Sequence, residues 1–91
     1  LMTEPREVQI QKAIEEWLCG IGLYPFQVLY TALGPVLKIT FLMKPEVDEF
    51  LEFFDYRNLA DKSGIQVWPE TMTILLSGVT LNYFFEKVLS G

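Results

Sequence analysis

The most restrictive feature of the sequence is a run of 21 residues, Trp17–Leu37, that contains no charged side chain. One helix of this length is long enough to cross a bilayer, which takes about 20 apolar residues. The run is interrupted by five residues that break helices: Gly20, Gly22, Pro25, Gly34 and Pro35. Since these would disrupt one continuous helix repeatedly, we predict a buried turn and two strands, with no membrane span.

The amino-acid composition excludes several classes of protein. The 91 residues include 12 acidic and 7 basic side chains, so the net charge is −5, and 51% of the residues are apolar. The chain is too apolar to be disordered and too acidic to bind nucleic acid by neutralising phosphates. One cysteine and no histidine exclude a disulfide framework and every histidine-based metal or proton-transfer site. The length fits a single domain, residues 1–91.

The start of the chain carries no predicted targeting segment. Leu1 precedes Met2 and is interpreted as a residue left from cloning. Glu4, Arg6 and Glu7 then stand where the apolar core of a signal peptide would begin. We therefore expect a cytoplasmic protein.

Apolar periodicity predicts two main helices and three clear strands. The first helix covers Arg6–Cys19, with apolar residues recurring every three or four positions. The second covers Glu46–Tyr56 and follows Pro45, which fits a first helical turn. The strands, in which apolar residues alternate, are Phe26–Thr31 and Leu37–Lys44, joined by a hairpin through Ala32–Val36, and Ile65–Trp68.

The segment after the third strand fits two structures. Alternation over Thr71–Leu76 is compatible with a strand that enters a hairpin at Ser77-Gly78 and returns over Val79–Tyr83. We favour a helical turn beginning at Pro69, then a strand at Val79–Asn82 and a last helical piece at Tyr83–Leu89. The predicted fold class is α+β: a small mixed or antiparallel sheet of about four strands covered by two main helices.

Two sets of residues are candidates for chemistry. Asp48, Glu52 and Asp55 share one face of the second predicted helix, a spacing that suits a hard cation or an acid/base pair, but also a solvated acidic face, which we favour. Cys19 is the only thiol, and without a basic partner it is interpreted as a buried or half-buried small residue. We therefore predict no catalytic, cofactor-binding or metal-ligating residue, no cofactor, and no iron–sulfur cluster or zinc, which need about four ligands.

Parts of the sequence resemble the A-type iron–sulfur carrier (HesB-like) domain. The matching stretches read Ser63-Gly64-Ile65-Gln66-Val67-Trp68 and Leu76-Ser77-Gly78-Val79-Thr80-Leu81-Asn82-Tyr83. The order of elements is similar over Val8–Gly20, Phe26–Met43 and Gly64–Gly91. Where that family carries its first cluster cysteine this chain has Leu33-Gly34-Pro35, and it ends at Gly91 before the family's cysteine-bearing tail. The resemblance thus implies a compact β-rich fold that has lost its cluster.

The expected function is that of a non-catalytic interaction or assembly-factor module, because catalytic groups are missing and aromatic residues are in surplus. Two alternatives remain: a cluster-free relative of the iron–sulfur carriers acting as an accessory protein in cofactor assembly, and a small enzyme using Cys19 or the acidic helix. Aromatic clusters at 50–56 and 83–85 predict a two-fold homodimer or a protein partner, unless they pack on each other. The predicted partner-binding residues are Phe53, Tyr56, Tyr83, Phe84 and Phe85.

Overall fold

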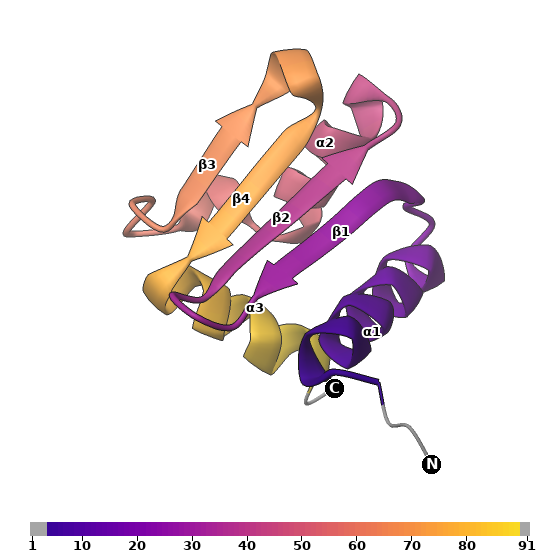
Figure 1. The fold of residues 1–91 in the computed structure, drawn as a ribbon. Helices are drawn as coiled ribbons and strands as arrows, with labels where there is room; N and C mark the ends of the chain where they lie inside the picture. The colour runs from indigo at the N-terminus through magenta and orange to yellow at the C-terminus, as the bar shows by residue number, and fades with distance from the viewer. Residues whose placement is uncertain (1–3, 90–91) are drawn as a thin grey trace.

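The computed structural model describes residues 4–89, so the interpretation of Leu1 and the expectation about the chain's end lie outside the described residues. Within residues 4–89 the chain forms three α-helices and one four-stranded sheet (Figure 1). The elements are α1 (Arg6–Gly20), β1 (Pro25–Thr31), β2 (Val36–Phe41), α2 (Lys44–Phe53), β3 (Ile65–Trp68), β4 (Thr73–Ser77) and α3 (Gly78–Leu89), with 3₁₀ turns η1 (Tyr56–Asn58) and η2 (Pro69–Thr71).

The sheet has the order β1-β2-β4-β3, and every neighbouring pair is antiparallel. The helices lie on one side of it: α2 and α3 stand behind the sheet in Figure 1, and α1 runs alongside β1. The predicted α+β fold is therefore confirmed, with a wholly antiparallel sheet and α3 as a third covering helix. The face of the sheet turned toward the viewer carries no helix.

The hydrophobic core fills the space between the sheet and the helices. Strand β2 shows how the sequence selects the buried side, because Leu37, Ile39 and Phe41 are buried while the residues between them are only partly covered. This is the alternation expected of a strand with one face packed on a core. The four aromatic side chains that are almost fully buried are Phe41, Phe50, Phe54 and Phe84.

The last third of the chain differs from the favoured sequence reading. The predicted helical turn at Pro69 is present as η2, but the fourth strand is Thr73–Ser77, and Val79–Asn82 belongs to helix α3. The hairpin alternative was right to place a strand before Ser77 and wrong to place another after it.

Two glycines explain this arrangement. Gly78 follows β4 and is the first residue of α3; its φ is 60°, a left-handed conformation that glycine adopts without steric cost. Gly64, just before β3, packs so closely on Ser77 and Thr80 that a Cβ at this position would overlap both residues. The junction between β4 and α3 is therefore fixed by contact with a segment distant in the sequence, which local periodicity does not report.

The uncharged run Trp17–Leu37 forms the end of α1, all of β1 and the start of β2, so the prediction of two strands is confirmed. Its predicted burial is wrong in part. Phe26 and Leu33 are exposed: Phe26 lies at a β-bulge of β1, and Leu33 lies in the turn between β1 and β2. Among the described residues, no helix is both long enough and apolar enough to cross a membrane.

The two edge strands of the sheet, β1 and β3, differ in what lies beside them. At the β1 edge, side chains of α1 accept two hydrogen bonds: the N–H of Tyr30 in β1 donates to Oε1 of Gln11 (2.9 Å), and the N–H of Ala32, in the turn just after β1, donates to Oε2 of Glu7 (2.8 Å). The β3 edge has no neighbouring strand, but it is only four residues long and is followed by Pro69, which has no N–H to donate. Short edges and prolines are features that oppose strand addition.

Candidate interaction site

The predicted partner-binding residue Phe84 lies in the core and not on the surface. Its exposed fraction is 0%, and its ring contacts those of Trp17, Phe50 and Phe54 at centroid distances of 5.7–5.8 Å. Position 84 points inward because it follows Leu81 by three residues on α3, which places both on the covered face of the helix. The assignment of Phe84 to a partner surface is therefore wrong.

The other predicted partner-binding residues divide into two pairs. Tyr56 and Phe85 are half-buried, and Phe85 packs edge-on against Tyr30 with ring centroids 5.4 Å apart. Phe53 and Tyr83 are 44% and 43% exposed, but the ammonium group of Lys87 lies over both rings, at 5.7 and 5.8 Å from their centroids.

The two aromatic clusters also contact each other directly. The ring of Phe54 packs against that of Tyr83 with centroids 5.7 Å apart, and Phe50 and Phe54 both contact Phe84. The two aromatic clusters therefore pack on each other within one core over most of their surface, as the alternative prediction had it. A patch made of Phe53 and Tyr83 remains, and the Lys87 side chain shields part of it.

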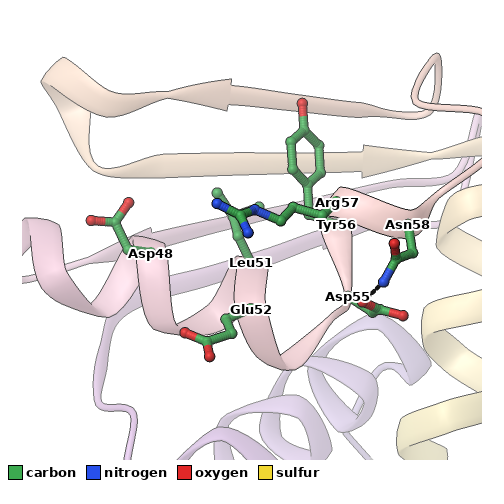
Figure 2. Close-up of a pocket in the computed structure, with 7 residues that line it drawn as sticks. All are labelled: Asp48, Leu51, Glu52, Asp55, Tyr56, Arg57 and Asn58. Atoms are coloured by element: carbon green, nitrogen blue, oxygen red, sulfur yellow. Dashed lines mark hydrogen bonds between the residues drawn. The ribbon is translucent and has the colours of Figure 1, made fainter.

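The acidic helix does not gather its carboxylates. Figure 2 shows Asp48, Glu52 and Asp55 around a hollow of about 470 Å³, with their carboxylates pointing in different directions. Asp48 forms an exposed ion pair with Lys44 (3.9 Å), and Asp55 accepts a hydrogen bond from Asn58 (2.7 Å). Among residues 4–89, no group of three or more histidine, cysteine or acidic side chains is placed to hold a metal ion.

The helix also ends earlier than predicted, which separates the third carboxylate from the first two. Helix α2 covers Lys44–Phe53, whereas the prediction was Glu46–Tyr56. Asp55 follows it in a left-handed conformation with a φ of 63°, which redirects the chain into η1. The predicted spacing of one continuous helix face therefore holds for Asp48 and Glu52 alone.

Cys19 is exposed near the end of α1, so the prediction of a buried or half-buried cysteine is wrong. The covered stripe of this helix passes through Ile14 and Leu18. The next position, Cys19, is rotated by 100° from Leu18 and points to solvent.

One side of the sheet carries no helix among the described residues, although Thr73 on this side is itself buried. Strand register aligns its residues in three rows across the strands. We call this surface the open face. Its rows, read from β1 to β3, are Gln27–Thr40–Thr73–Trp68, Leu29–Lys38–Leu75–Gln66, and Thr31–Val36–Ser77 at the end nearer the β1–β2 turn.

The open face differs from the rest of the molecule in its charge. None of its residues is acidic, although the chain holds 12 carboxylates, and Lys38 is its one charged residue. Lys38 is half-buried between Leu29 and Leu75 in the middle row. The two ion pairs found within residues 4–89 join Lys12 to Glu4 and Lys44 to Asp48, so neither neutralises it.

Exposed apolar side chains border one end of the open face. We call Tyr24, Phe26, Leu42 and Met43 the apolar rim; all four are more than half exposed, and Phe26 reaches 69%. The carboxylate of Glu46 holds the two sides of the rim together by accepting hydrogen bonds from the N–H groups of Tyr24 (3.0 Å) and Met43 (3.1 Å). A β-bulge at Phe26 interrupts the pairing of β1 there.

Sequence reasoning missed this surface, although part of its signal was present. The predicted strands already alternated, so Lys38 and Thr40 had to face away from the core and Leu29 opposite to Val28. What the sequence did not reveal is that no helix covers that side.

One carboxyl group outside these surfaces has a perturbed pKa. The side chain of Ser63 and then its N–H, which donates to Oδ1 of Asp61 (2.9 Å), stabilise the carboxylate and lower the pKa of Asp61 below its ordinary value. These contacts hold the loop before β3, away from the open face. The shift therefore has a local structural cause.

Comparison of the chain with protein-family models, with curated proteins and with solved structures gave no match. The resemblance to the HesB-like domain thus stays a prediction.

Proposed function

We propose that this chain is a non-catalytic protein-interaction module whose contact surface is the open face together with the apolar rim. The observation that carries the proposal is the contrast between the open face and the rest of a chain with net charge −5: the rows of the open face bear one lysine and no carboxylate, and exposed apolar side chains border them. Exposed apolar surface bordered by polar groups is typical of contact sites.

The chemistry of the open face also favours binding over reaction. Its polar groups are hydroxyls, amides and one ammonium group, and the hydroxyls of Thr40 and Thr73 lie 3.3 Å apart and are engaged with each other. A hydroxyl needs an adjacent base to act as a nucleophile, and the rows contain neither carboxylate nor imidazole. Such groups orient a partner by hydrogen bonding.

The test compares two variants with the same substitution. Leu29→Asp places a charge on the open face, whereas Leu33→Asp places it four residues away on the exposed β1–β2 turn. Affinity capture from native extract with mass spectrometry, together with light scattering over a dilution series, should detect a partner or homodimer that Leu29→Asp loses and Leu33→Asp retains. Equal capture by wild type and Leu29→Asp, when both are folded, would place the contact elsewhere.

A further inference from the structure

The size of the open face limits what can cover it. Four strands spaced by about 4.8 Å and three rows spaced by two residues give a surface of roughly 19 by 20 Å, or about 400 Å² in projection. A helix of 18 residues is about 27 Å long and about 10 Å wide, which matches the diagonal of the face. The opposite face already packs helices of 15, 10 and 12 residues.

The charge of Lys38 determines which side chain a helix docked on this face needs. Its ammonium group has no ion-pair or hydrogen-bond partner within the described residues, and its apolar neighbours across the strands are Leu29 and Leu75. A partner covering this row removes water from the lysine, which is costly unless a charge of opposite sign replaces that water. A second copy docked face to face would bring another Lys38 and no carboxylate to this surface.

Neither edge of the sheet favours strand addition. At the β1 edge, Gln11 of α1 already accepts a hydrogen bond from the Tyr30 N–H, and the β3 edge is only four residues long and ends at Pro69. Docking therefore takes place on the face and through side chains.

Building on the proposed function, we infer that the open face binds an amphipathic α-helix of a protein partner, with one Asp or Glu set within the apolar stripe of that helix and paired with Lys38. Leu29, Leu75 and Trp68 contact the apolar residues of the stripe, and the apolar rim extends the contact at one end.

The experiment uses a displayed library of 18-residue helical peptides with apolar residues at i, i+3, i+4 and i+7 and a randomised central position. Selection is run against the wild-type chain, Lys38→Glu and Arg6→Glu. Arg6 is an exposed residue at the start of α1, so Arg6→Glu changes the net charge equally without touching the face. Folding of each variant is confirmed by circular dichroism and thermal unfolding.

The expected result is at least about tenfold enrichment of Asp and Glu at the central position for wild type and Arg6→Glu, and enrichment of Lys and Arg for Lys38→Glu. Peptides selected on wild type should lose binding to Leu29→Asp and keep it with Leu33→Asp.

Three results would overturn the inference. Binding that Leu29→Asp abolishes, without an acidic preference, would remove the role of Lys38 and leave the proposed function standing. Absence of peptides sensitive to Leu29→Asp would show that helices do not dock here, and the capture experiment would still decide the proposed function separately. A concentration-dependent dimer that Leu29→Asp dissociates would make a second copy the occupant.

Discussion

Replacing Phe84 by alanine tests whether its side chain stabilises the core or belongs to a partner-binding surface. The ring is fully buried and lies within 6.4 Å, centroid to centroid, of four other aromatic rings. Removing a buried phenylalanine costs its transfer free energy, about 1.5–3 kcal/mol, plus the cavity left behind, so the total is about 3–5 kcal/mol. A domain of 91 residues has a free energy of unfolding of about 5–14 kcal/mol. Phe84→Ala should therefore remove a large part of the stability.

The matched control is Tyr83→Ala, one residue earlier on α3. Tyr83 is 43% exposed and contacts Phe54 with one side of its ring, so its loss should cost less than about 1.5 kcal/mol. Urea unfolding followed by circular dichroism measures the free energy of unfolding of both variants. The slope of this free energy against urea concentration (the m-value) should be the same for both variants and the wild type. If Phe84→Ala costs no more than Tyr83→Ala, the packing argument fails and the partner-surface assignment of Phe84 regains its basis.

Three further predictions concern the framework of the sheet. Gly64→Val should destabilise the fold by about 1–3 kcal/mol in urea unfolding, since the new side chain would overlap the β4–α3 junction. Gln11→Ala should cost about 0.5–1.5 kcal/mol and should accelerate hydrogen exchange at the Tyr30 N–H while leaving the other strands protected. Ser63→Ala should raise the pKa of Asp61 toward its ordinary value in an NMR titration, because the side-chain hydrogen bond that lowers it is lost. Since the folded pKa of Asp61 is lowered, its contribution to stability is present above the unfolded pKa and is lost as pH falls through the folded one.

The elements that the sequence predicted are those whose pattern is repeated locally. Strand β2 alternates without interruption from Leu37 to Phe41, and α1 keeps its apolar stripe through Ile14 and Leu18, so both were located to within a few residues. Their patterns arise because one side of each element packs on a single core.

The elements that were misplaced depend on contacts distant in the sequence. Alternation over Thr71–Leu76 allowed a strand here, but β4 carries apolar residues on both faces, Ile74 toward the core and Leu75 toward the open face, so the pattern suited a helical turn as well. Gly78 suits a hairpin as well as a turn into a helix, and the close packing of Gly64 on this junction decides between them. The exposure of Phe53 and burial of Phe84 follow from the same placement of α3.

In the proposed complex, the single charge of the open face, on Lys38, would make binding selective. While water covers Lys38, an unpaired ammonium group beside Leu29 and Leu75 is well solvated and costs little. Once a partner covers the row, leaving that charge without a carboxylate costs several kcal/mol, which is comparable to the stabilisation that burying two leucines provides, at about 1.5–3 kcal/mol each. An apolar helix without an acidic residue therefore gains little at this site. Since neither sheet edge favours strand addition, recognition in the proposed complex would rest on this side-chain pattern, with Lys38 selecting helices that carry a carboxylate.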